Sequence, residues 1–120
     1  MDEAGKGNFL EEGLNNVPRR TYEFAKLDVE VLLQLKGLGY QPRVIFDVGA
    51  SNGFWSYQAH RAFSDAEYHL FEPLVDHVPE YKRLMEENLR SHPSFVLHKV
   101  AVGDRTGEAT INLHRDPSGS

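Results

Sequence analysis

The pattern of apolar positions divides the chain into alternating helices and strands. Apolar residues recur at helical spacing over residues 18 to 36, and Gly37 is placed to end that helix. The run Val44–Val48 is almost wholly apolar, which predicts a strand covered on both faces. Similar runs predict a second strand over Glu67–Phe71 and a third over residues 95 to 102.

Two more helices and a fourth strand follow from the same pattern. A short helix with an aromatic-rich buried side is expected after the first strand, with Trp55 as a packing residue. The next helix begins at Pro79, with Asp76 or His77 as its cap, and alternation over residues 108 to 114 predicts a half-buried strand. This order predicts an α/β fold with a three-layer, Rossmann-like parallel sheet joined by right-handed crossovers.

Composition and charge narrow the possible partners. The chain has 120 residues, 40% hydrophobic and 26% charged, which suits one soluble domain or part of one. Residues 1 to 17 are rich in glycine, asparagine and acidic residues, so they are expected to form a mobile lead-in to a domain over residues 18 to 120. A net charge of -5 without a basic block disfavours nucleic acid and anionic membranes.

The cysteine and histidine content excludes further kinds of functional site. The sequence has no cysteine, so disulfides, thiolate nucleophiles and thiolate zinc sites are excluded. The six histidines show no paired spacing on one helix or hairpin, and no metal is assigned. Residues 1 to 12 lack the apolar core of a signal peptide, and a cytoplasmic protein is expected.

A glycine turn and an acid mark the candidate site. Gly49 can turn sharply after the first strand, and Gly53 allows the next helix or a ligand to approach the backbone. Glu72 follows the second strand, about twenty residues further on, where an acid reaches ribose hydroxyls in nucleotide-binding folds. Because ligands of such sheets bind beyond the carboxyl ends of the strands, both features are expected to meet there.

Three ligand classes and one catalytic alternative are considered for this turn. A dinucleotide favours a middle glycine where this chain has Ser51, and a triphosphate loop needs a Gly-Lys-Ser/Thr ending that is absent. S-adenosylmethionine has no pyrophosphate and tolerates a looser turn beside an acid. The same five residues also match the G-x-S-x-G nucleophile elbow, with Ser51 as nucleophile and Asp76 paired with His98 or His114. Against this hydrolase, only one helix and a polar tail precede the turn.

Three motifs in order resemble the FkbM-type family of S-adenosylmethionine-dependent methyltransferases. They are residues 44 to 56, Phe71-Glu72-Pro73, and residues 100 to 104 followed by Gly107. The resemblance implies that the methionine part lies along the turn, that Glu72 holds the ribose, and that the backbone after the third strand lies near the adenine. The implied cofactor-binding residues are Asp47, Gly49, Ala50, Ser51, Asn52, Gly53, Glu72, Pro73, Val100 and Ala101. Many relatives have an aspartate near the adenine, where this chain has Ala101 and, further on, Asp104.

The resemblance also implies a reaction and an incomplete sheet. The reaction is in-line methyl transfer to the hydroxyl of a small molecule or sugar, and no catalytic residue is assigned. A complete sheet of this kind usually has seven strands, so the chain is expected to be the N-terminal part of such a domain. The exposed apolar edge of the first strand would then be covered by the C-terminal half or by a second copy. The alternative is an incomplete, non-catalytic module.

Overall fold

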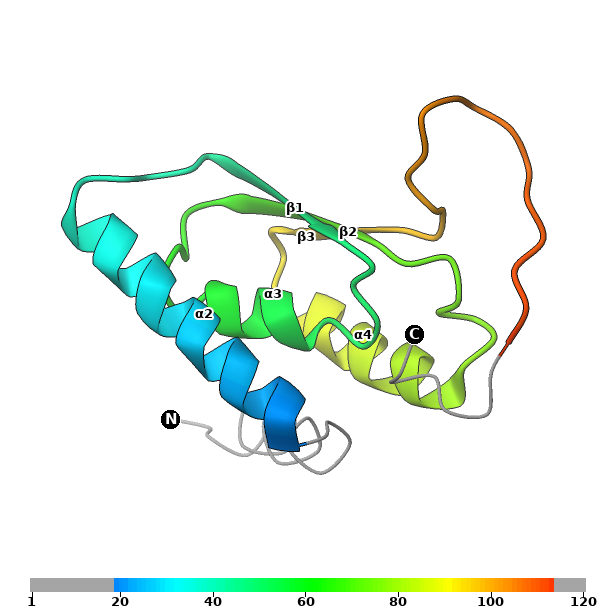
Figure 1. Ribbon diagram of the computed structural model, residues 1–120, viewed down its shortest axis with the longest axis horizontal. Coiled ribbons are helices and arrows are strands. Elements are labelled where there is room, and N and C mark those ends of the chain that lie inside the picture. Colours follow the sequence, from blue (N-terminus) through cyan, green and yellow to red (C-terminus); the bar gives the residue numbers. More distant parts are fainter. Residues whose placement is uncertain (1–18, 114–120) are drawn as a thin grey trace.

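The chain forms a parallel α/β sheet with helices between its strands (Figure 1). The computed structural model describes the backbone of residues 19 to 113 and the side chains from residue 28 onward. In chain order the elements are α2 (Arg19–Gly37), β1 (Val44–Val48), α3 (Phe54–Ala59), β2 (Glu67–Phe71), α4 (Pro79–Ser91) and β3 (Phe95–His98). The predicted α/β class and the bounds of the first two strands are confirmed, whereas the expected lead-in lies outside the described residues.

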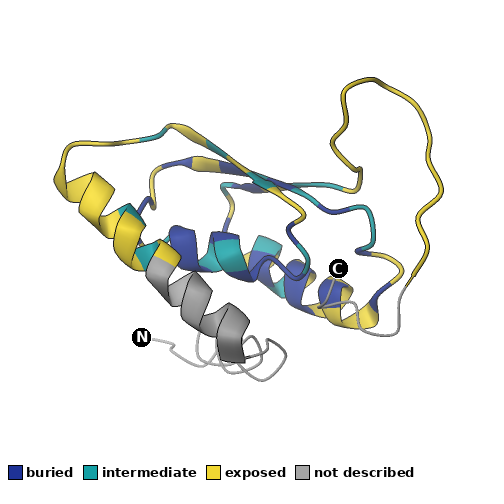
Figure 2. Cartoon of the chain, viewed as in Figure 1, coloured by how far each residue is buried: buried dark blue, intermediate teal, exposed yellow. Residues whose placement is uncertain are grey.

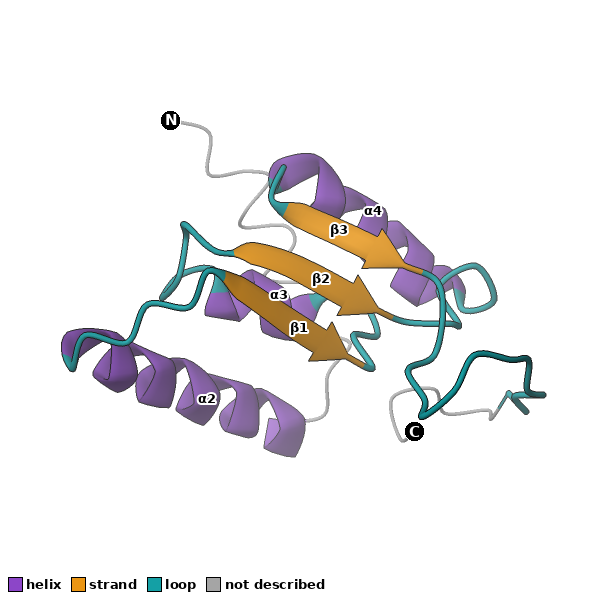
Figure 3. Ribbon diagram, turned by 90° about the horizontal axis from the view of Figure 1, so that it is seen from above, coloured by secondary structure: helices purple, strands orange, loops and turns teal. Residues whose placement is uncertain are grey.

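The sheet has the strand order β1-β2-β3, with both pairs parallel. Val48 lies opposite Phe71, which in turn lies opposite His98, so the carboxyl ends of the three strands are level. Both crossovers run in the same direction across the sheet, and right-handed connections then place α3 and α4 on one face (Figure 3). The described helices therefore form one layer on the sheet, and the opposite face carries none of them.

The core lies between the sheet and these helices. Tyr68 and Leu70 of β2 are fully buried, as are Ala59 of α3 and Met85 of α4. The Tyr68 hydroxyl donates a 2.8 Å hydrogen bond to the Phe63 carbonyl oxygen, which satisfies a polar group that would otherwise be unpaired in the core. Burial raises the pKa of Tyr68. The central strand is thus held by apolar packing and by one internal hydroxyl contact.

The opposite face of the sheet is open (Figure 2). Val44, Phe46 and Val48 alternate along β1 and are 51%, 65% and 59% exposed. The expectation of a strand covered on both faces is therefore wrong for the described residues, because the helices cover only the face that carries Ile45 and Asp47. β1 is also the outer strand of the sheet that the described residues form.

Three local predictions are wrong for the described residues. The third strand ends at His98, and residues 99 to 113 form neither helix nor strand, so the strand expected over residues 108 to 114 is absent from its described part. An alternating pattern needs a strand to pair with and a surface to pack on, and this segment arches away from the sheet (Figure 1). Val78 is the N-cap of α4, because Asp76 instead binds Lys99 at 3.0 and 3.1 Å.

Candidate functional site

The turn after β1 is shaped by three residues in the left-handed region. Gly49, Ser51 and Gly53 have φ of 77°, 55° and 86°. The backbone N–H groups of Gly49 and Ala50 both donate to the Phe71 carbonyl oxygen, at 2.9 and 3.1 Å. The turn is therefore attached to the carboxyl end of the neighbouring strand β2, where the sequence predicted that it would lie.

Glu72 fastens the same turn through its side chain. It is 6% exposed, and its Oε1 accepts a 2.9 Å hydrogen bond from the Ser51 N–H. Its Oε2 accepts a 3.0 Å bond from the Leu74 N–H, and its own N–H donates to the His98 carbonyl oxygen at 3.0 Å. Glu72 thus joins the ends of all three strands. A carboxylate offers about four acceptor positions, so two bonds leave capacity for ligand hydroxyl groups.

Asp47 places a second acid beside Glu72. Its Oδ2 accepts a 2.7 Å hydrogen bond from the Ser56 hydroxyl, which is fully buried in α3. Burial raises the pKa of Asp47, the Ser56 bonds oppose that shift, and the negative charge of Glu72 adds to it. Sequence reasoning assigned no role to Ser56. Its only signal was its place in the last position of the first motif.

Replacing Asp47 by asparagine is expected to raise the free energy of unfolding at neutral pH. Because its pKa is raised above 3.8 in the folded chain, protonation of Asp47 stabilises the fold. That contribution is fully present below the unfolded pKa and is lost as the pH rises through the folded pKa. Asparagine keeps an acceptor for Ser56 and never ionises, so the gain should be greater near neutral pH than in acid.

Urea unfolding at mildly acidic and at neutral pH measures this difference. The exposed Asp65→Asn variant is the control and should leave both free energies unchanged. An Asp47→Asn variant that is less stable than the native chain at neutral pH would show that the negative charge itself supports the turn.

Asn52 and Ala50 are buried in the turn, as Glu72 is, and their expected contact with a cofactor stays a prediction. The Asn52 side-chain oxygen accepts a 2.9 Å hydrogen bond from the N–H of Phe54, the first residue of α3. Asn52 is 8% and Ala50 5% exposed. Both residues therefore support the shape of the turn from within.

The structure does not assemble the alternative hydrolase site. Asp76 binds Lys99, and His98 Nε2 lies 2.8 Å from His69 Nδ1. Within the described part of the chain no hydrogen bond joins Ser51 to a histidine, and His114 lies outside that part. A nucleophile needs a base within hydrogen-bond reach, and none is placed there.

The expected adenine-binding residues lie on an exposed segment. Val100 is 54% exposed and Ala101 is also exposed, while Pro73 next to Glu72 is half-buried. In the described residues no hydrogen bond ties Val100 or Ala101 to the turn. Their role toward an adenine stays a prediction.

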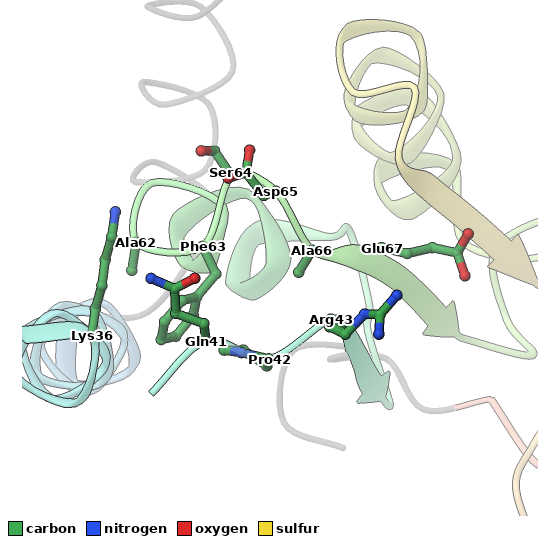
Figure 4. Close-up of a pocket in the computed structure, with 10 residues that line it drawn as sticks. All are labelled: Lys36, Gln41, Pro42, Arg43, Ala62, Phe63, Ser64, Asp65, Ala66 and Glu67. Carbon is green, nitrogen blue, oxygen red and sulfur yellow. The ribbon is translucent and has the colours of Figure 1, made fainter. Parts of the chain in front are cut away.

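A separate pocket of about 360 Å³ opens at the other end of the sheet (Figure 4). It lies at the amino ends of β1 and β2, next to Arg43 and Glu67. Lys36 and Asp65 also line it, so its charges are mixed. None of the residues expected to bind cofactor lines this pocket. Among the described side chains of residues 28 to 113, no cluster of three or more metal-ligating groups occurs, and no helix in the described residues is long and apolar enough to cross a membrane.

The chain has a distant structural likeness to a known protein. No family model and no curated protein matches the chain. A solved structure of precorrin-6y C5,15-methyltransferase from Geobacter metallireducens GS-15 aligns with a TM-score of 0.44 and 19% sequence identity. The alignment covers 62% of this chain and 36% of that enzyme, so the chain spans only about a third of its length.

Proposed function

We propose that the chain is the S-adenosylmethionine-binding part of a methyltransferase. The observation that carries this proposal is the attachment of the glycine turn to Glu72 at the level carboxyl ends of β1 and β2. This edge of a parallel sheet is where such folds bind their ligands. Asp47 and Glu72 make it acidic, which suits a ligand with a positive sulfonium and a ribose diol.

The same contacts disfavour a dinucleotide or a triphosphate. A pyrophosphate is held by free backbone N–H groups of the turn. Here the N–H groups of Gly49 and Ala50 donate to Phe71, and that of Ser51 donates to Glu72. The carboxylate of Glu72 would also repel a phosphate at this point. A ligand without phosphate is therefore the better match.

The reaction that we propose is methyl transfer to a hydroxyl group of a small molecule or sugar. Bound S-adenosylmethionine supplies an electrophilic methyl group, and the chain's residues hold the cofactor in one orientation. Asp47 and Glu72 would hold its polar groups, while Gly49 leaves open space beside the turn, since an added Cβ would meet no atom within 4 Å. Such enzymes act chiefly by aligning the acceptor with the methyl group.

Glu72→Gln is expected to weaken S-adenosylmethionine binding at least about tenfold. Glutamine has one acceptor oxygen, so it cannot accept from both Ser51 and Leu74, and its amide group would face an N–H donor. Calorimetric titration of native and variant protein measures the loss. The exposed Glu86→Gln variant of α4 removes the same charge away from the site and should bind as the native chain does.

The titration also separates the remaining alternatives. Absence of heat with folded native protein would overturn cofactor binding. Heat with S-adenosylmethionine but none with a nicotinamide dinucleotide is the expected pattern. Binding without conversion to S-adenosylhomocysteine, over a panel of sugar and small-molecule alcohols, would favour the non-catalytic module.

A further inference from the structure

Helix α4 contacts the glycine turn from the side opposite its open surface. Asn88 is 1% exposed, and its Nδ2 donates a 2.8 Å hydrogen bond to the Gly53 carbonyl oxygen. A Cβ added to Gly53 would lie 2.5 Å from that nitrogen and 3.2 Å from the Met85 sulfur. By contrast, a Cβ on Gly49 would meet nothing within 4 Å. The two glycines therefore have different roles. Gly49 allows a sharp turn beside open space, whereas Gly53 allows α4 to pack closely on the turn.

The Gly53 carbonyl links two helices. It accepts the bond from Asn88 and also a 3.0 Å bond from the Tyr57 N–H, the first backbone bond of α3. Holding this oxygen fixes the peptide plane between Gly53 and Phe54, where the turn passes into α3. The preceding residue, Asn52, accepts a hydrogen bond from the N–H of Phe54, the first residue of the same helix.

Asn88 is a destabilising residue at this position if its only role is to fill space. Its Oδ1 is buried and has no hydrogen-bond partner among the described residues. An unpaired buried acceptor destabilises a fold, and an apolar side chain would avoid that cost. The amide is therefore better explained by what its donor does to Gly53 than by packing alone.

We propose that Asn88 is a positioning residue for the cofactor turn. By holding the Gly53 carbonyl, it fixes the orientation of residues 49 to 53 and so the alignment of Glu72 with the turn. The proposal rests on the proposed function for its effect on S-adenosylmethionine, whereas its effect on the shape of the turn can be tested without any ligand.

The first test measures amide exchange in the absence of cofactor. In Asn88→Leu the turn should lose its anchor, so the Ser51 and Phe54 amide protons should exchange at least about fivefold faster than in the native chain. The urea midpoint of this variant should be unchanged or higher, because the orphan acceptor has been removed. Unchanged exchange at both amides would overturn the proposal, whether or not the native chain binds cofactor.

The second test is a double-mutant cycle read by S-adenosylmethionine affinity. Asn88→Ala and Gly53→Ala should each weaken binding about tenfold, the latter because its new Cβ collides with the Asn88 amide. Adding Gly53→Ala to Asn88→Ala should cost less than adding it to the native chain, since the collision with the amide is gone and only the strain of a Cβ at φ 86° and the contact with Met85 remain. Multiplicative losses would contradict the contact as the cause. If the native chain binds no cofactor, the proposed function fails and amide exchange alone decides the role of Asn88.

Discussion

Leu70→Ala is expected to lower the free energy of unfolding by about 3 kcal/mol. Leu70 is fully buried in the central strand, and its removal leaves a cavity between the sheet and the helices. It also lies two residues before Glu72, so the end of β2 that holds the turn should loosen. The loss is a large part of the stability of an ordinary domain, about 5 to 15 kcal/mol.

Urea denaturation followed by Trp55 fluorescence and by circular dichroism measures this loss. Leu38→Ala is the matched control, because that leucine is 84% exposed and its truncation should change stability by less than about 0.5 kcal/mol. A loss as small for Leu70→Ala as for the control would mean that the core between sheet and helices is not formed as described.

Phe46→Lys is expected to abolish self-association of the chain. Phe46 is 65% exposed at the centre of an outer strand whose apolar face has no cover in the described residues. Such edges pair with other chains unless a charge or proline blocks them. The native protein should therefore sediment as dimers or larger species and bind a hydrophobic dye, whereas the variant should be monomeric with several-fold less dye fluorescence.

Ile111→Lys controls for the added charge, because Ile111 is also exposed but belongs to no strand of the sheet. Phe46 makes edge-to-face contacts with His69 and Phe71, at 5.6 and 5.4 Å between ring centroids, so the variant should lose about 1 kcal/mol of stability. A native chain that stays monomeric at high concentration would contradict the expectation.

The strands that could be predicted are those whose boundaries are local. Val44–Val48 and Glu67–Phe71 are apolar runs that end at Gly49 and at Glu72-Pro73, so sequence alone sets their limits. The strand expected over residues 108 to 114 has an equally clear pattern, but a strand forms only against a partner. Residues 99 to 113 have none in the structure. Pattern therefore predicted which segments prefer extended backbone, and pairing decided which of them became strands.

In the candidate site, too, some features could be predicted from the sequence and others depended on tertiary packing. The meeting of the turn with Glu72 followed from parallel topology, because level strand ends bring both to one edge. The roles of Ser56 and Asn88 did not, since they depend on which face of α3 and of α4 packs against the turn. Gly53 was expected to let the next helix or a ligand approach the backbone, and the side chains that approach it are Asn88 and Met85 of α4. Periodicity predicts that a helix face is buried, but not which atom each buried polar group meets.

The bonds from Gly49 and Ala50 to the Phe71 carbonyl also bear on the order of folding. The turn ends in the sequence at Gly53, but the Phe71 carbonyl that holds it is in place only when β2 has paired in parallel with β1. That pairing requires the whole crossover through α3 to close, and the entropy of closure is lost before the contacts are gained. The glycine turn is thus a late product of folding, and a peptide of residues 44 to 56 would contain the motif without the strand that gives it its shape.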